Sequence, residues 1–430
     1  MDLFVLLGTL FLCFGLGMPI SYALGFGALV GALWIGIPPE AVMLKISDGV
    51  SKVAMLTIPF FVLAGAIMAE GGMAHRLVKL ANVIVGTVRV RGGLSAVNIL
   101  ATTFLSGISG SSVADVSAIG SVLIPQMEKV GYPRVFATNV TISGSLQAIV
   151  VPPSHNAVIY SLATGGTISI ISLFMAGVVP GLLLGFALVI LCLFIAYRDG
   201  HPTGEAVPLR DAVKITIDAT WGLITIVIII AGILLGIFTA VEAGAVACVW
   251  AFLVTMFIYR DYRWGDLPAL VHRTLRTVAM VMTLIAMASS FGYVMALMQL
   301  PAKITMFFLS VSENKYVILM LINFMLLVLG CLMDMAPLIL ICTPILLPVV
   351  IKLGVDPVHF GMIMLLNLGI GLLTPPVGST LFVGCAIGNV KMEEVIRTIW
   401  PFYAVMFAVL MMVTFIPAIS LWLPTVLHTR

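Results

Sequence analysis

The sequence is poor in charge. Of its 430 residues only 9% are Asp, Glu, Lys or Arg, and 61% are hydrophobic, whereas a soluble domain carries about 25% charged residues. No water-exposed surface can be built from this composition, so we expect the chain to lie in a lipid bilayer. The net charge is only +3 and the basic residues form no cluster, which argues against a nucleic-acid partner.

Motifs for metal binding and catalysis are also missing. The six cysteines form no CxxC pair, and the six histidines are scattered without an HExxH motif. Disulfides, a thiolate metal site and an intramembrane enzyme are therefore not expected. The N-terminus has no basic region and no cleavage site, so we expect the first apolar run to be a retained helix and not a removable signal peptide.

Long apolar runs are abundant. A spanning helix needs about 20 apolar residues, and such runs occur at 3–36 (a pair), 56–72, 76–88, 94–127, 134–165, 167–197, 217–259 (a pair), 277–299, 316–351, 357–390 and 399–424. The one substantial polar connector, 198–214, separates residues 1–197 from 215–430. These features predict an all-α polytopic membrane protein in two halves.

The two halves resemble each other. A shift of 223 residues, without a gap over about sixty residues, brings the Pro-Pro pair 152–153 onto 375–376. The same shift matches Gly107, Gly131 and Gly165 to Gly330, Gly354 and Gly388. We interpret the match as an internal duplication.

The distribution of positive charge predicts how the halves are oriented. If 94–127 and 316–351 are re-entrant hairpins, and 3–36 and 217–259 are helix pairs, 13 basic residues fall on one side and 6 on the other. The first group is Arg89, Arg91, Lys129, Arg134, Arg198, Arg210, Lys214, Arg260, Arg263, Arg273, Arg276, Lys391 and Arg397; the second is Lys45, Lys52, Lys303, Lys315, Lys352 and Arg430. The positive-inside rule makes the first side cytoplasmic. The halves then form an inverted repeat, as in many secondary transporters. The alternative, ordinary helix pairs, is disfavoured because each segment of about 33 residues is short for two spans and a turn.

The centre of the first hairpin is rich in Ser and Gly. Irregular backbone at membrane depth must line an enclosed or watered cavity. Hydroxyl and carbonyl oxygens suit a hard cation, and free amides at the start of the next half-helix suit an anion. Small residues also allow close helix packing, but the duplicate hairpin favours a site. The candidate cation ligands here are Ser106, Gly107, Ser109, Ser111 and Ser112.

The second hairpin carries an aspartate at the equivalent position. Under the 223-residue shift Asp334, four residues after Gly330, takes the place of Ser111. A charge at mid-membrane costs roughly 2.5–3.5 kcal/mol on insertion scales, and the same apolar segment holds no Lys or Arg, so we expect a bound cation as its partner. Asp115 lies one turn beyond Ser111, where it either shares that face or braces a neighbouring helix.

A helix interrupted by Pro-Pro follows each hairpin. Consecutive prolines remove two amide donors and free the carbonyls before them. A single break would be read as a kink, but two related breaks, each beside a polar tip, favour paired sites. Asn139 and Gln147 either line the cavity or form interhelical hydrogen bonds, and His155 alone does not make a proton relay. The further cation candidates are Pro152, Gly330, Asp334, Thr374, Pro375 and Gly378; the substrate candidates are Ser111, Asp115, Asn139, Ser154, Asn156 and Ser379.

Several of these segments together resemble the large membrane subunit of the tripartite ATP-independent periplasmic (TRAP) transporters. They are 17–24 (GMPISYAL), 58–65 (IPFFVLAG), the Ser/Gly hairpin, 151–154 (VPPS), 239–244 (TAVEAG) and 373–378 (LTPPVG). The family usually has Pro-Thr-Glu-Ala where this chain has Ala240, Val241, Glu242 and Ala243. The family's threonine is thus absent here, and no role for it carries over to this chain.

The resemblance implies a transporter of the bacterial inner membrane that imports carboxylates, such as sialic acid or C4-dicarboxylates, coupled to two or more Na⁺ ions. It also implies an elevator motion and two partners: a small four-helix membrane subunit and a periplasmic substrate-binding protein. Two alternatives remain at this point. One is a sodium- or proton-coupled elevator transporter that needs no binding protein, and the other, less compatible with paired broken helices, is a passive channel.

Overall fold

The computed structural model describes residues 2–86, 90–203, 207–312, 314–427 and 429. These residues are almost entirely helical; apart from an isolated bridge between Arg91 and Thr203 they contain no extended pairing. Within them, seven helices are long and apolar enough to cross a membrane, or up to nine if each bent pair is one span. The predicted all-α polytopic fold is confirmed.

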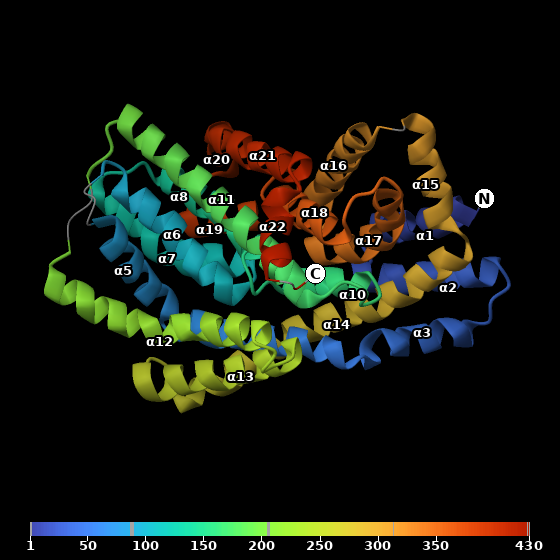
Figure 1. The fold of residues 1–430 in the computed structure, drawn as a ribbon, viewed down its shortest axis with the longest axis horizontal. Helices are drawn as coiled ribbons and strands as arrows, with labels where there is room; N and C mark the ends of the chain where they lie inside the picture. The colour runs from blue at the N-terminus through green and yellow to red at the C-terminus, as the bar shows by residue number, and fades with distance from the viewer. Residues whose placement is uncertain (1, 87–89, 204–206, 313, 428, 430) are drawn as a thin grey trace.

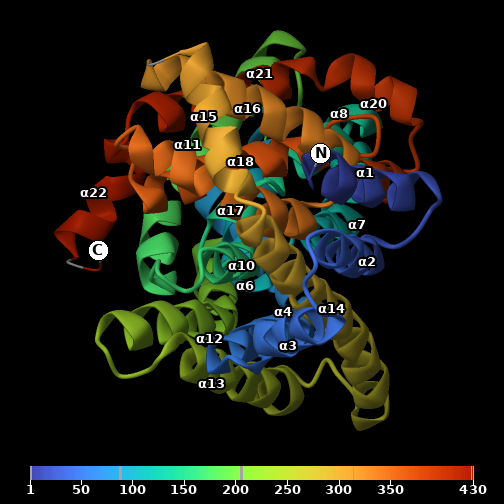
Figure 2. The same cartoon turned by 90° about the vertical axis from the view of Figure 1, so that its right-hand side faces the viewer.

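One layer of the molecule consists of long helices from both halves. In Figures 1 and 2, α3, α12, α13 and α14 lie together along the lower side, and α14 also packs against α2 and α4. The bounds are α1 Asp2–Gly15, α2 Ile20–Trp34, α3 Pro39–Ser51, α4 Thr57–Glu70, α12 Leu209–Leu234, α13 Ala240–Leu253 and α14 Leu267–Leu297.

Above this layer each half contributes a helical hairpin followed by a broken helix. In the first half these are α6 (Gly93–Ser109) with α7 (Ser112–Val130), then α8 (Arg134–Gly144), α9 (Gln147–Val150) and α10 (His155–Ala163). In the second half they are α16 (Lys315–Leu332) with α17 (Met335–Lys352), then α18 (Pro357–Leu372) and α19 (Ser379–Gly388). The breaks fall at the two Pro-Pro pairs, as predicted.

The argument from hairpin length is wrong in detail. The hairpins cover 93–130 and 315–352, a few residues more than predicted, and α16 and α17, of 18 residues each, are each long enough to qualify as a span. Their depth follows instead from what their tips contact. Each tip packs against the break of a broken helix, as described below, and therefore ends part-way along that helix. This arrangement is the one that a re-entrant hairpin requires.

Contacts between the halves follow the same plan twice. The returning arm of each hairpin packs against the half-helix that follows the break in the other half: α7 against α19, and α10 against α17. The first arm of each hairpin packs against the broken helix of its own half, α6 against α8 and α9, and α16 against α18. The two halves are therefore interlocked through the pairs α7–α19 and α10–α17.

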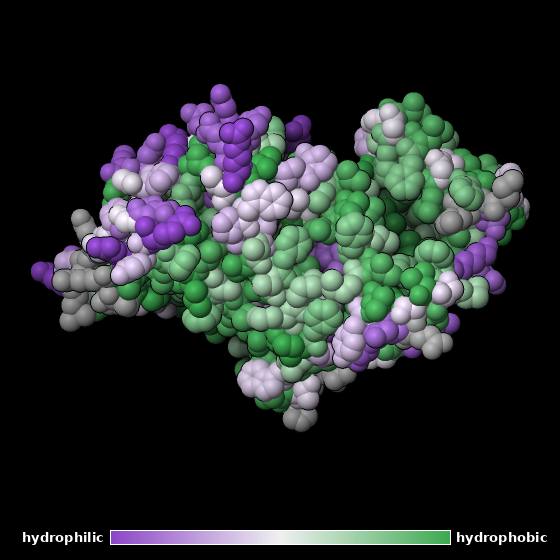
Figure 3. Space-filling view, turned by 90° about the horizontal axis from the view of Figure 1, so that it is seen from above, coloured by the Kyte–Doolittle hydropathy of each residue, from purple (hydrophilic) through white to green (hydrophobic). Residues whose placement is uncertain are grey.

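The remaining elements connect and enclose these units. They are α5 Met73–Gly86, α11 Ile170–Arg198, α15 Leu300–Val311, α20 Met392–Thr398, α21 Trp400–Phe415 and α22 Ala418–Val426, with short η1 Val53–Leu56, η2 Val254–Tyr259 and η3 Trp264–Asp266. The face in Figure 3 is largely hydrophobic, with hydrophilic residues gathered toward the two ends of the long axis, a distribution that suits a bilayer-spanning protein. Arg89 and Arg430, counted in the charge argument, lie outside the described residues.

Candidate transport site

The first hairpin turns on Gly110 and Ser111. Gly110 has a φ of +61°, a left-handed conformation that glycine adopts without steric cost, and it ends α6. Ser111 then caps α7, because its hydroxyl accepts a hydrogen bond from the amide of Ala114 at 3.4 Å. The Gly-Ser pair therefore reverses the chain within two residues and starts a new helix N-terminus at the tip.

Asp115 braces this tip. Its carboxylate accepts hydrogen bonds from the hydroxyl of Ser106 at 2.6 Å and from the hydroxyl of Ser109, so it joins the end of α6 to the start of α7. The side chain is fully buried, and none of the ion pairs among the described residues includes it. A buried carboxylate held only by hydroxyl groups is costly unless a cation compensates it. Bracing, one of the two roles considered for Asp115, is therefore observed, and its charge also fits a nearby cation.

The first tip lies directly against the first break. The side-chain amide of Asn156 reaches the carbonyl oxygen of Gly110 at 3.5 Å. A Cβ added to Gly107 would lie 3.2 Å from the carbonyl oxygen of Pro152, and one added to Gly110 would lie 3.0 Å from Nδ1 of His155. Larger residues at either position would push the tip away from the break. The hydroxyl of Ser154 donates to the carbonyl of Ile149 at 2.7 Å, which satisfies one of the carbonyls that the break frees.

Two candidates have interhelical partners instead. The side-chain amide of Asn139 donates to the hydroxyl of Thr398 at 2.7 Å, and Asn139 precedes Val151 by twelve residues, roughly 18 Å along a helix. Gln147 accepts a hydrogen bond from Thr103 at 2.6 Å and donates to the carbonyl of Ile99. Of the two roles considered for them, the structural hydrogen bond is the one observed, and Asn139 lies apart from the tips.

The second tip meets the second break in a similar way. The amide of Val377 donates to the carbonyl of Cys331 at 3.1 Å, and a Cβ on Gly371 would lie 2.6 Å from the backbone of Gly330. Thr374 returns a hydrogen bond to the carbonyl of Ile370 at 2.8 Å. Thus Gly330, Thr374, Pro375 and Gly378 lie together, as predicted.

Asp334 lies at the second tip, where the returning arm of the hairpin begins. It stands at the N-cap position of α17 without making a side-chain capping bond, and it is exposed. The bound cation expected beside it stays a prediction. The buried uncompensated carboxylate of the site is Asp115.

The two half-sites meet at a pair of helix N-termini. The hydroxyls of Ser112, at the start of α7, and Thr380, at the start of α19, are 2.7 Å apart. The hydroxyl of the adjacent Ser379 is buried and has no hydrogen-bond partner among the described residues. Two positive helix ends and an unused hydroxyl make this a favourable place for an anion.

Thr380 and Tyr403 were not among the predicted site residues. Thr380 follows the second break directly, but its partner Ser112 is distant in sequence. The hydroxyl of Tyr403, in α21, donates to the carbonyl of Leu373 at 2.5 Å, so it satisfies another of the carbonyls freed by the break. No local pattern in the sequence signals either contact.

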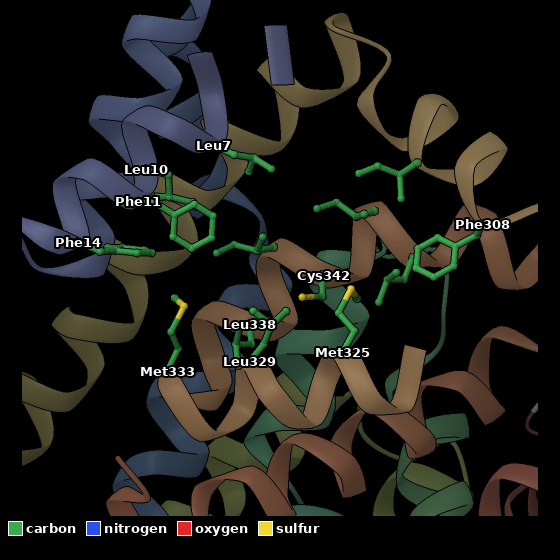
Figure 4. Close-up of a pocket in the computed structure, with 14 residues that line it drawn as sticks. Leu7, Leu10, Phe11, Phe14, Phe308, Met325, Leu329, Met333, Leu338 and Cys342 are labelled. Carbon is green, nitrogen blue, oxygen red and sulfur yellow. The ribbon is translucent and has the colours of Figure 1, made fainter. Parts of the chain in front are cut away.

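An apolar cavity of about 190 Å³ adjoins the second tip but does not belong to this site. It lies between α1, α15, α16 and α17 and is lined by leucine, isoleucine, phenylalanine, methionine and cysteine side chains, among them Met333 (Figure 4). It offers no side-chain nitrogen or oxygen to an ion or a carboxylate.

Comparison with known proteins agrees with the geometry. The DctM component of the tripartite ATP-independent periplasmic transporters matches residues 7–419. The chain is 41% identical to YgiK of Salmonella typhimurium, covering 98% of this chain and 97% of that one. It is 36% identical to the C4-dicarboxylate TRAP transporter large permease protein DctM of Rhodobacter capsulatus, covering 99% and 100%. The Vibrio cholerae sialic acid large permease SiaM is 34% identical, covering 97% and 98%.

A solved structure supports the fold alone. The YdaH transporter of Alcanivorax borkumensis, described as having an unusual topology, superposes with a TM-score of 0.60 at 14% identity, covering 87% of this chain and 86% of that one. The sequence relatives are transport proteins and not enzymes, and they place this chain, with its many apolar helices, in the bacterial inner membrane as a multi-pass protein. The chain belongs to the DctM family, the large permease subunits through which tripartite ATP-independent periplasmic transporters move organic acids.

Proposed function

We propose that this chain is the translocating subunit of a sodium-coupled importer of a carboxylate, of the sialic acid or C4-dicarboxylate type. The observation that carries the proposal is the meeting of α7 and α19 at Ser112 and Thr380, 2.7 Å apart, next to the buried carboxylate of Asp115. One centre then offers groups of opposite character, helix N-termini for an anion and buried oxygens for a cation.

The anion side uses no intramembrane Lys or Arg. Amide groups at the N-termini of α7 and α19 point their dipoles toward the centre, and the hydroxyl of Ser379 is a buried donor without a partner among the described residues. Ser111 and Ser154 are already engaged in capping and in satisfying a carbonyl. We therefore assign Ser379 and the adjacent amides to the carboxylate, with Asn156 holding the tip against the break.

The cation side uses hydroxyls, freed carbonyls and Asp115. The hydroxyls of Ser106 and Ser109 donate to Asp115, so each oxygen keeps lone pairs that can face a cation; one of those on Ser109 accepts a hydrogen bond from the amide of Ser111 at 3.3 Å. Carbonyls near Pro152 and those before the second break add neutral oxygens, the donor type that hard cations prefer. A bound Na⁺ would supply the positive charge that Asp115 lacks.

Coupling follows from charge balance. With neither solute bound, Asp115 is uncompensated, whereas one cation for Asp115 and a second for a singly charged carboxylate make the loaded centre nearly neutral, so that it crosses more easily. Each net positive charge moved inward gains roughly 2.3 kcal/mol per 100 mV. More than one Na⁺ per singly charged substrate would therefore make uptake concentrative.

Two partners complete the transporter in this proposal. The family is named as tripartite, and one relative, the isethionate permease DctMQ of Oleidesulfovibrio alaskensis, is long enough that the match covers only 66% of it. The small four-helix subunit would contact the exposed apolar faces of the helices within 3–36 and 217–259, for which Phe4, Ile217 and Val249 are examples. A periplasmic binding protein would deliver the substrate, and α6–α10 with α16–α19 would move as one body in an elevator.

Thermal stability of the purified chain in detergent tests the site directly. A ligand that binds only the folded protein raises the melting temperature with its concentration. We expect NaCl to stabilise the chain more than KCl at equal ionic strength, and succinate or sialic acid to add to this effect only when Na⁺ is present. Equal melting temperatures in the two salts, with and without the carboxylates, would contradict the proposal.

A further inference from the structure

A polar cleft lies where α3 and α14 face α10 and α17. Two adjoining cavities, of about 420 and 230 Å³, share Gly49, Lys52 and Ser289 in their walls. The second also reaches Leu162 of α10 and Leu340 of α17. The four helices converge in Figure 2, so the cleft separates the long-helix layer from the hairpin and broken-helix unit.

The cleft carries one uncompensated positive charge. Lys45 is paired with Asp48 at 2.8 Å, and Asp48 is the one carboxylate in either wall. Lys52 belongs to none of the ion pairs among the described residues. The hydroxyls of Ser289 and Tyr293 line the same space. A cation with neighbouring hydroxyl donors is the arrangement that binds a carboxylate.

Two glycines shape the cleft: one allows α3 and α14 to pack closely, and the other leaves space in the cavity. A Cβ on Gly49 would lie 2.6 Å from the hydroxyl of Ser289, so α3 and α14 pack closely there. One turn of α14 further on, a Cβ on Gly292 would meet nothing within 4 Å, because Gly292 faces the cavity. A side chain can therefore be placed at Gly292 without disturbing the packing of α3 against α14.

The cleft leads toward the transport site. Leu340 and Pro344 line it and lie five and nine residues after Met335, where α17 begins at the second tip. These separations correspond to roughly 8–14 Å along the helix. Lys52 is one of the basic residues that the charge distribution assigns to the outer side, the side from which an imported anion would arrive.

We propose that this cleft is a recruiting site in which Lys52 meets the organic carboxylate before it reaches the hairpin tips. The inference rests on the proposed function, since it assumes that the solute is an anion. Lipid phosphate shares the same anionic chemistry, and the test below distinguishes the two. Lys52 acts as a positioning residue, because it lies outside the centre formed by the tips and breaks.

Charge-selective labelling of Gly292→Cys tests the proposal without requiring transport. The reagents are sulfonatoethyl methanethiosulfonate, which is negative, and trimethylammonioethyl methanethiosulfonate, which is positive; each rate is divided by the rate with free cysteine, and background from the native cysteines is subtracted. We expect the negative reagent to react faster. Adding Lys52→Gln should lower the ratio of the two rates about three- to fivefold, the effect of removing one nearby charge, whereas Lys315→Gln, a lysine outside the cleft, should leave it unchanged.

Occupancy is tested in vesicles of phosphatidylcholine with and without phosphatidylglycerol. Succinate or sialic acid should slow the labelling in pure phosphatidylcholine, and Lys52→Gln should remove this protection. Three results would overturn the proposal: a ratio of labelling rates that Lys52→Gln leaves unchanged, protection by phosphatidylglycerol alone, or no protection by either carboxylate. Labelling of Gly292→Cys does not depend on uptake. A failure of the recruiting site would therefore appear in the labelling rates, whereas a failure of sodium coupling would appear in the melting temperatures.

Discussion

In the structure the buried aspartate of the candidate site is Asp115 and not Asp334. From the sequence, Asp334 is the costly charge, because it replaces a serine at the tip of an apolar hairpin. In the structure Asp334 is exposed, while Asp115 is fully buried and held by two serine hydroxyls. In the proposed cation site, Asp115 is therefore the residue that we expect to depend most on the ion.

Asp115→Asn should weaken sodium binding strongly. The amide keeps the shape of the carboxylate and can still bond to Ser106 and Ser109, but the charge is lost. We expect the half-saturating Na⁺ concentration to rise about tenfold or more, equivalent to about 1.4 kcal/mol, in a thermal-stability titration. The melting temperature without Na⁺ should stay the same or rise, because an uncompensated buried charge has been removed. Asp334→Asn is the comparison, with a smaller shift expected, and an equal or larger shift would contradict this ranking.

Ser379→Ala should weaken substrate binding without lowering the stability of the folded protein. The hydroxyl is buried without a partner among the described residues, so its removal should not lower the melting temperature. If it contacts the carboxylate, substrate affinity should fall about ten- to hundredfold, the loss of one hydrogen bond to a charged group, while sodium affinity is unchanged. Ser161→Ala is the matched control, since that hydroxyl donates to Ile168. Unchanged substrate affinity in Ser379→Ala would place the carboxylate elsewhere.

At the scale of residues, the sequence predicts which residues lie at the tips and breaks better than it predicts their contacts with distant parts of the chain. The duplication and the Pro-Pro pairs correctly bring Gly107, Pro152, Gly330 and Thr374 to the tips and breaks. The contacts of Ser112 with Thr380 and of Tyr403 with Leu373 join residues far apart in the chain. They depend on how the halves pack, which no local pattern encodes.

At the scale of elements, the hairpins depend on close backbone approach to the broken helices. Gly371→Ala would place a Cβ 2.6 Å from the backbone of Gly330, and neither backbone can yield as a flexible side chain would. We expect a loss of about 1–3 kcal/mol of stability, typical of overpacking, and impaired uptake. Gly8→Ala in α1 meets nothing within 4 Å and should be neutral or slightly stabilising. Equal melting temperatures for the two variants would show that the second hairpin does not depend on this contact.

Long apolar runs with clear breaks predict their helices, whereas hydropathy does not predict the helices that interrupt this pattern. The hairpins and broken helices follow from Ser/Gly tips and Pro-Pro breaks within apolar runs. The helices α3, α15 and α20 fall outside the predicted runs because they are short or carry charged residues, as at Lys45, Lys303 and Glu393. Their helical form depends on packing beside α14, α17 and α8, which hydropathy does not report.

At the scale of the whole molecule, the inverted repeat predicts opposite faces for the two hairpin entrances. Single cysteines at Arg91, before α6, and at Asn314, which caps α16, should react with a membrane-impermeant thiol reagent from opposite sides. In intact cells Asn314→Cys should be labelled and Arg91→Cys only after permeabilisation. Glu313, the other natural choice, lies outside the described residues. Labelling of both from one side would contradict the inverted arrangement.

The contact plan gives the molecule one site from two halves. Each returning hairpin arm packs on the half-helix of the other repeat, α7 on α19 and α17 on α10. A layer of long helices lies beside this unit (Figure 1). In the proposed function, this assembly would carry cations and an organic anion together between the two faces of the membrane.

Uptake by proteoliposomes tests this coupling most directly. The chain is reconstituted with its small membrane subunit, and labelled succinate or sialic acid is supplied with its binding protein, under an inward Na⁺ gradient or an equal K⁺ gradient. We predict concentrative uptake with Na⁺ and none above background with K⁺. Uptake that is equal in both gradients, or that follows a proton gradient instead, would contradict sodium coupling; full uptake without the binding protein would contradict the tripartite assignment for this chain.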